Sequence, residues 1–175
     1  SEPHRWGSAV GSALRRWTLP RWFWLLWTGL LALAQVPVGV NLPEGSALTL
    51  SAEEVVFDLA QGAYPPPSFP YAYAPTSPRG PLTLSVFSNL EGGWAVEVLA
   101  EPLIAEGGKL LSPSQLEVRV DGGPWMPLGP RTVLLTGSGP SGGYRRHLLE
   151  FRLVLTGQEA PGLYRGSLVF TLSRL

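Results

Sequence analysis

Few side chains in this sequence are suited to acid–base or nucleophilic chemistry. The chain has no cysteine and only two histidines, His4 and His147, which excludes thiolate sites and histidine-based zinc sites built from this chain alone. A Ser-His-Asp arrangement would need His147 together with Asp58 or Asp121, and no G-x-S-x-G turn accompanies it. We therefore expect no catalytic triad.

Other candidate sites also have simpler explanations. Glu97, Glu101 and Glu106 have the spacing of a glycosidase pair or of calcium ligands, but the sequence has only two aspartates and no Asp-rich loop. These carboxylates are interpreted as solvated charges. The glycine-rich run 137–143 lacks the Lys-Ser/Thr ending of a phosphate-binding loop and is interpreted as a flexible loop. The sequence predicts a non-enzymatic protein without metal or cofactor.

The first 34 residues have the three-part pattern of a secretory signal peptide. A leader with four arginines precedes the uncharged run 22–34, which ends in the small-x-small sequence Ala32-Leu33-Ala34. This run is too short to cross a bilayer comfortably as a helix, although apolar residues continue at Val36, Val38 and Val40. We expect cleavage before Gln35, and the alternative is that residues 1–34 stay attached as an uncleaved membrane anchor.

The net charge of the chain differs on the two sides of the boundary between residues 34 and 35. Residues 1–34 hold four of the 13 basic residues and one of the 13 acidic residues, so residues 35–175 have a formal charge of −3. A nucleic-acid partner is therefore not expected. The expected location is secreted, periplasmic or at the cell surface, with membrane contact only through an uncleaved N-terminal segment.

Apolar and polar residues alternate with period two from residue 46 onward, and no stretch of ten residues has a helical pattern. Each alternating set predicts a strand with one buried face. Turn sequences separate the sets, and residues 156–162 are expected to close a C-terminal hairpin. The pattern predicts an all-β fold, an antiparallel immunoglobulin-like β-sandwich of about seven or eight strands over residues 48–175, preceded by the signal helix. The expected strands lie near residues 82–86, 94–98, 116–120, 149–155 and 164–172, with shorter candidates at 48–50, 55–59 and 132–135.

Two tryptophans follow glycine-containing turns at points where a strand is expected to resume. Trp94 has the same parity as Val96 and Val98 and is therefore expected to face the core. Trp125 follows Gly123 and Pro124 and is expected to be the second main core aromatic residue.

Residues 64–81 interrupt the alternation with seven prolines and four aromatic residues. Proline removes backbone donors from a sheet, so this segment is predicted to be a long extended loop. Rigid exposed rings lose little entropy on binding, and so Tyr64, Phe69, Tyr71 and Tyr73 are candidate partner-binding residues. The other interpretation is that the four rings cover one end of the sandwich core.

Residues 35–47 form an N-terminal extension or a first strand. Val36, Val38, Val40 and Leu42 alternate with small or polar residues, which suits a strand with one apolar face, and Pro37 restricts that strand to an edge. In one interpretation the segment pairs within its own chain. In the other it adds to a neighbouring copy, whose last strand lacks a final partner and leaves an apolar groove open.

Three runs of sequence are informative in their order along the chain: Val56-Phe57-Asp58-Leu59, Gly92-Gly93-Trp94-Ala95-Val96, and Ala160-Pro161-Gly162-Leu163-Tyr164. Placed after a signal segment, they resemble the secreted spore coat protein U family and related fimbrial β-sandwich subunits. The resemblance implies an immunoglobulin-like fold and a structural role at a bacterial surface. It assigns no catalytic residue.

These patterns predict an exported, non-enzymatic structural subunit of a bacterial cell-surface structure, such as a pilus-like fibre or an envelope layer. Such a subunit would assemble through β-strand addition, so its partners are proteins, with copies of itself among the candidates. The alternative is a periplasmic or extracellular binding or chaperone-type module that recognises its ligand through residues 64–81.

Overall fold

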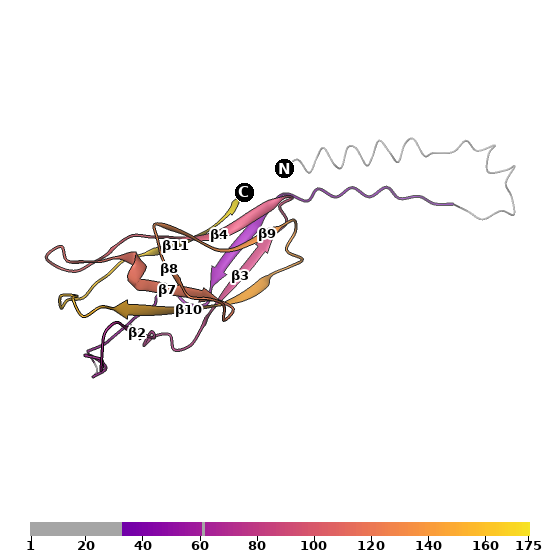
Figure 1. Cartoon of the computed structure of the whole chain (residues 1–175). Coiled ribbons are helices and arrows are strands. Elements are labelled where there is room, and N and C mark those ends of the chain that lie inside the picture. Colours follow the sequence, from indigo (N-terminus) through magenta and orange to yellow (C-terminus); the bar gives the residue numbers. More distant parts are fainter. Residues whose placement is uncertain (1–32, 61) are drawn as a thin grey trace, which may run out of the picture. The chain divides into compact units, whose positions relative to one another are not determined.

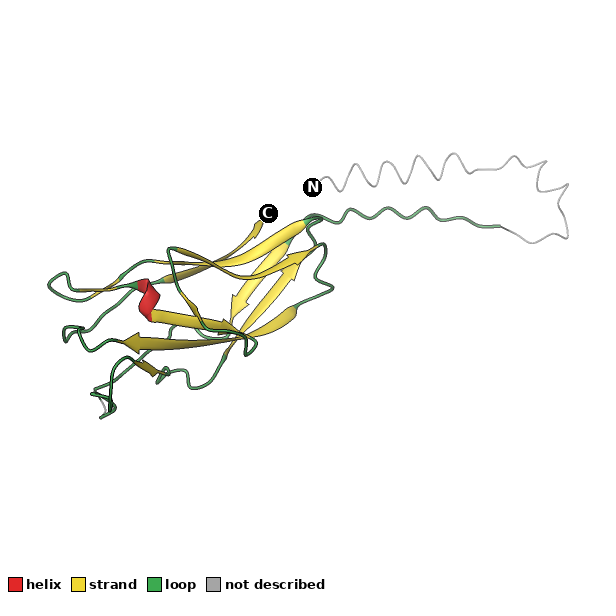
Figure 2. Cartoon of the chain, in the orientation of Figure 1, coloured by secondary structure: helices red, strands yellow, loops and turns green. Residues whose placement is uncertain are grey.

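The computed structural model describes residues 33–60 and 62–175, so the expected signal segment lies outside the described residues except for Leu33 and Ala34. Residues 44–175 form one compact unit. Within the described residues, the regular elements are strands and one short 3-10 helix (Figure 2). No helix in this part is both long enough and apolar enough to span a membrane.

Most of the strand residues between 44 and 175 belong to two antiparallel sheets (Figure 1). The strands of the larger sheet are β1 (Ser46–Leu50), β2 (Tyr71–Tyr73), β3 (Leu82–Ser88), β7 (Leu116–Val120), β8 (Met126–Pro127) and β10 (Arg145–Leu155). Their order is β1-β3-β10-β7-β8, and β2 pairs with the end of β10. The smaller sheet has the order β11-β4-β9 and consists of β4 (Gly93–Ala100), β9 (Arg131–Ser138) and β11 (Leu168–Arg174). The strands β5 (Leu103–Ile104) and β6 (Leu110–Leu111) form a separate hairpin, and the 3-10 helix η1 spans Pro113–Gln115.

The two sheets pack around a shared apolar core. Leu84 and Leu149 of the larger sheet and Val96 and Val98 of the smaller sheet have no exposed surface, and all four belong to one buried cluster. Burial alternates along β3 and along the second half of β10, as the period-two pattern predicts. This confirms the all-β fold and its antiparallel sandwich.

The two tryptophans occupy different environments. Trp94 is 6% exposed, and its Nε1 donates a hydrogen bond to the carbonyl of Gly139 at 3.0 Å. Trp125 is only half-buried and lies 4.6 Å and 4.3 Å from the guanidinium carbons of Arg119 and Arg152. The expectation for Trp125 is therefore wrong. Its neighbour Met126 pairs with the inward-facing Val118, so alternation places Trp125 on the outer face.

The predicted C-terminal hairpin is also wrong. β10 and β11 belong to different sheets, so residues 156–162 connect the sheets instead of joining adjacent strands. The reason is that both edges of β10 are already occupied. One edge pairs with β7, and the other pairs with β3 and then β2. β11 therefore pairs with β4.

Three segments differ from the expected strands. Residues 164–167 precede β11 and contain only an isolated bridge, between Arg165 and Ile104. Residues 33–45 form no strand, and β1 is the first strand in the described part of the chain. The structure therefore differs from the interpretation in which residues 36–42 are the first strand of their own sandwich. Residues 55–59 contain only an isolated bridge between Val56 and Ser77. The candidates at 48–50 and 132–135 lie within β1 and β9.

Candidate functional site

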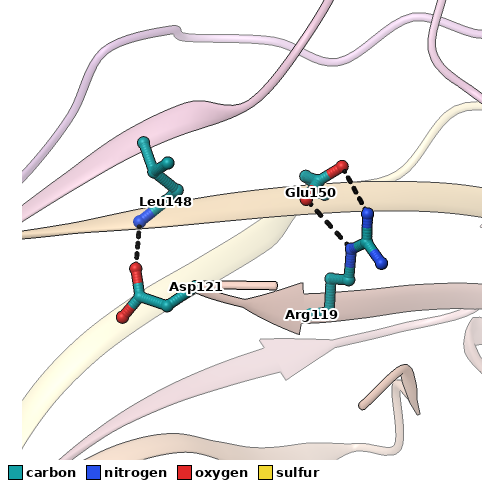
Figure 3. Close-up of polar contacts among 4 residues, drawn as sticks. All are labelled: Arg119, Asp121, Leu148 and Glu150. Atoms are coloured by element: carbon teal, nitrogen blue, oxygen red, sulfur yellow. Dashed lines mark hydrogen bonds and ion pairs between the residues drawn. The ribbon is translucent and has the colours of Figure 1, made fainter. Parts of the chain in front are cut away.

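The histidine–aspartate pair considered from the sequence does form. The Nδ1 atom of His147 lies 2.7 Å from Oδ2 of Asp121. Oδ1 of Asp121 accepts the backbone N–H of Leu148 at 2.8 Å, as Figure 3 shows. The hydrogen bonds from His147 and Leu148 lower the pKa of Asp121. Among the described residues, no serine or threonine hydroxyl hydrogen bonds to His147. The pair fastens the β7–β8 turn to β10 and lacks a nucleophile.

Further charged pairs hold strands together. Arg119 donates two hydrogen bonds to the carboxylate of Glu150, at 2.9 and 3.0 Å (Figure 3). Glu97 is buried, pairs with Arg131 at 2.8 Å and accepts a hydrogen bond from the Ser173 hydroxyl, so it links β4 to both neighbouring strands. It is therefore not the solvated charge expected from the sequence. In the part of the chain that the structure describes, no group of three acidic or histidine side chains is placed to hold a metal ion.

The glycine-rich run 137–143 is held more firmly than a free loop. Gly137 and Ser138 belong to β9, and the backbone N–H of Ser141 donates to the carbonyl of Ser88 at 2.7 Å. The Ser141 hydroxyl in turn accepts the N–H of Ser88 and donates to the carbonyl of Gly143. This run fastens the two sheets together at one end of the sandwich.

The aromatic residues of the 64–81 loop divide into two groups. Tyr73 is 8% exposed and belongs to the core cluster, and its hydroxyl donates to the carbonyl of Ala63 at 2.7 Å. Tyr73 therefore is not available to a partner. Tyr64, Phe69 and Tyr71 are 44%, 39% and 40% exposed, and we call these three residues the aromatic tip. The interpretation in which the rings cover the core thus holds for Tyr73, and the partner-binding interpretation stays a prediction for the aromatic tip.

An apolar cleft of about 1320 Å³ opens between the two sheets on the side of β1 and β11. Leu50 of β1 and Leu168 and Phe170 of β11 contribute to its lining, together with Phe57 from the segment that follows β1. Acidic residues surround this apolar surface. Glu53, Glu54, Asp58 and Glu159 are among the lining residues, against a single arginine, Arg165.

Glu159 fixes the turn at one border of this cleft. Its carboxylate accepts hydrogen bonds from Gln115, from the N–H and hydroxyl of Thr156, and from the N–H of Gly157, at 2.7 to 3.0 Å. Burial raises the pKa of Glu159, but the hydrogen bonds from Thr156 and Gly157 outweigh it and lower the pKa to about 2. The border of the cleft is therefore ordered and negatively charged at neutral pH.

The strands on either side of the cleft are edge strands. In the described part of the chain, β11 pairs only with β4, and β1 pairs only with β3. Their inward-facing side chains are only partly buried, unlike those of the central strands. These partly buried residues are Leu48 and Leu50 of β1 and Leu168, Phe170 and Leu172 of β11.

The hydrogen bonding of β11 determines which of its backbone groups are unpaired. The N–H of Leu175 donates to the carbonyl of Gly93, and hydrogen-bonded pairs alternate along an antiparallel ladder. Thr171 and Ser173 therefore bond to β4, whereas the N–H and C=O groups of Phe170 and Leu172 point to the open edge. The side chains of Phe170 and Leu172 both face inward, and that of Phe170 contributes to the lining of the cleft.

The gap between the two edge strands β1 and β11, which we call the seam, has two different ends. At one end Arg174 of β11 and Glu44, just before β1, form an ion pair of 2.8 Å that joins the two edges. At the other end the cleft is open, and Tyr64 and Glu159 lie at its border. The structure thus defines an antiparallel β-sandwich whose core is incompletely covered between its first and last strands.

No protein-family model, curated protein or solved structure matches this chain. The site is therefore interpreted from its own geometry. The sequence predicts a groove beside the last strand, but it gives no sign of the acidic border, because Glu53, Glu54 and Glu159 come together only in the fold.

Proposed function

We propose that this chain is an exported, non-enzymatic structural subunit of a bacterial cell-surface structure, a pilus-like fibre or an envelope layer, that assembles through β-strand addition. The observation that carries this proposal is the open edge of β11 beside an apolar cleft. The proposed added strand is residues 36–42 of a neighbouring copy. Val36, Val38, Val40 and Leu42 in this segment are 76%, 82%, 67% and 81% exposed.

The added segment and β11 match in length and pattern. Residues 36–42 and β11 both have seven residues, and both alternate apolar side chains with smaller or polar ones. In an antiparallel pair, opposite residues share a face, so Val40 would point into the cleft with Phe170, and Val38 would pack beside the partly buried Leu172. The backbone groups of Val38 and Val40 would then bond to β11. Pro37 has no N–H, and its nitrogen would point away from β11.

The direction of the added strand follows from the two ends of the seam. The Glu44–Arg174 ion pair closes one end, so the added segment must continue into its own sandwich domain through the open end, near Leu168. This requires Leu42 to lie near Leu168 and Val36 to lie towards Arg174, which is the antiparallel arrangement. Antiparallel pairing is also the more stable kind per residue.

Export to the surface is supported by the sequence pattern of residues 1–34 and by the resemblance to spore coat protein U and fimbrial subunits. The resemblance also supports an immunoglobulin-like arrangement of the sandwich. Strand addition at one edge is a heterologous contact that does not close on itself, and repeated contacts of this kind build fibres.

Deleting residues 35–42 should abolish self-association and leave the sandwich folded, because these residues form no part of its strands. Sedimentation velocity measures association, and circular dichroism measures folding. A synthetic peptide of residues 35–43 should bind the deleted chain. If the deleted chain associates as strongly as the intact one, or if the peptide does not bind, strand addition is wrong.

A second candidate function is supported by the exposure of the aromatic tip. In this alternative the chain is a periplasmic or extracellular binding or chaperone-type module that recognises a ligand through residues 64–81. The two proposals differ in the state of the intact chain. A monomer at every concentration favours the binding module, and ordered polymers favour the subunit.

A further inference from the structure

The two ends of the sandwich carry different elements. The strand registers place the start of β1, the start of β10 and the end of β11 at the same end, which we call the first end. The pairing of Leu155 with Tyr71 places β2 and the aromatic tip at the opposite end, which we call the second end. Figure 1 shows β2 and its loop at the far end of the sandwich from the start of β1.

The connection between the added segment and its own domain is very short. Only Pro43 separates Leu42 from Glu44, and Glu44 is held by Arg174. The next residue, Gly45, donates its N–H to the side chain of Asn89 at 2.7 Å. Because a residue spans at most about 3.6 Å, the first end of a donating copy must lie within about 7 Å of its own Leu42.

Antiparallel addition places that Leu42 beside Leu168 of the accepting copy, at the second end of its sandwich. The first end of one copy would therefore lie against the second end of the next. The inference rests on the proposed strand addition, and it concerns a separate surface from the cleft itself.

The chemistry of the two ends is complementary. The second end presents the aromatic tip together with the acidic residues that surround the cleft, among them Glu53 and Glu54. The first end presents Tyr144, whose ring lies 5.4 Å from that of Phe87, and the exposed residues Arg145 and Arg146. Of the acidic residues at the first end, Glu44 pairs with Arg174 and Asp121 pairs with His147, and Glu91 is exposed between β3 and β4. Aromatic and arginine side chains are the types that contribute most to protein interfaces.

We propose that the aromatic tip is a docking surface for the first end of the next copy of this chain, with Tyr144, Arg145 and Arg146 as its counterpart. Strand addition then supplies the connection between copies, and this end-to-end contact fixes their relative orientation. An end-to-end contact of this kind explains why the aromatic tip is exposed at the open end of the cleft.

The absence of cysteine from the chain allows a direct test by disulfide cross-linking between two purified full-length variants. Ser68→Cys places a thiol beside the aromatic tip, and Ser138→Cys, at the end of β9, places one at the first end without changing a proposed docking residue. Both positions are exposed, so neither change disturbs the core. The control partner is Val133→Cys, another exposed position within β9.

The Ser68→Cys and Ser138→Cys variants should form a mixed disulfide at least about tenfold faster than Ser68→Cys with Val133→Cys, because contact raises the effective concentration. Equal rates for the two pairs, in variants that bind the peptide of residues 35–43 in a separate assay, would overturn the end-to-end contact and leave strand addition standing. A preference for Ser138→Cys that persists after deletion of residues 35–42 would overturn strand addition as its basis.

Discussion

Replacing Trp94 by alanine should lower the free energy of unfolding by about 3–5 kcal/mol, the range for removing a large aromatic side chain from a core. Trp94 contributes to the buried cluster, and its indole N–H bonds to the carbonyl of Gly139. Its ring also fills the space above Gly137, its cross-strand partner, where no larger residue fits. The alanine variant would leave both a cavity and an unpaired carbonyl. Equilibrium denaturation monitored by circular dichroism measures the loss.

The matched control for this prediction is Trp125→Ala. Trp125 is outside the core, and it contacts Arg119 and Arg152 from the outer face of the larger sheet. Cation–π contacts at partly exposed sites contribute about 0.5–1 kcal/mol each, so this variant should lose only about 1–2 kcal/mol. Equal losses in the two variants would show that the assignment of Trp94 to the core and Trp125 to the surface is wrong.

Replacing Val38 by aspartate should weaken self-association by at least about 100-fold, because strand addition would bury the new carboxylate without a partner. Val38 is 82% exposed in the free chain, and so the fold itself should not change. Sedimentation velocity over a range of concentrations measures the effect, and circular dichroism confirms that the sandwich remains folded.

Asn41→Asp is the matched control, since it adds the same charge to the same segment. In the antiparallel arrangement Asn41 lies on the opposite face from Val38, pointing away from the cleft. Association should therefore remain within about threefold of that of the unchanged chain, a difference below about 1 kcal/mol. If both variants lose association equally, charge in the segment and not the apolar face is responsible, and the proposed orientation is wrong.

The strands themselves were predictable because their local pattern and their burial have the same cause. Residues 82–86 and 149–155 alternate in the sequence, and the structure buries the same alternate side chains in β3 and β10. The turn at Asp121 and Gly122 was predictable for a related reason. Both residues have positive φ, and few other residues accept this conformation in a tight hairpin.

The assignment of strands to sheets was not predictable in this way. Residues 156–162 have the composition of a hairpin turn, yet β10 already has neighbours on both edges, and these neighbours come from distant parts of the chain. The same long-range pairing makes β1 and β11 the borders of the cleft. Alternation shows that Leu172 faces inward, but not that its strand lacks a second neighbour.

Individual aromatic residues were predicted with mixed success for the same reason. The position of Trp125 depends on the two-residue strand β8, which is too short to show a pattern of its own. Tyr73 lies in a proline-rich segment without alternation, and only its pairing with Leu153 in β10 places it in the core. Tyr64 and Phe69 lie in a loop as expected, whereas Tyr71 belongs to the short strand β2, and the binding role of all three remains a prediction.

The most direct test of the central claim is amide hydrogen exchange along β11, measured by NMR with and without the peptide of residues 35–43. Strand addition predicts slower exchange for the N–H groups of Phe170 and Leu172, which point to the open edge. It predicts little change for Thr171 and Ser173, which already bond to β4. Unchanged exchange at Phe170 and Leu172 under saturating peptide, or protection confined to the aromatic tip, would contradict the account.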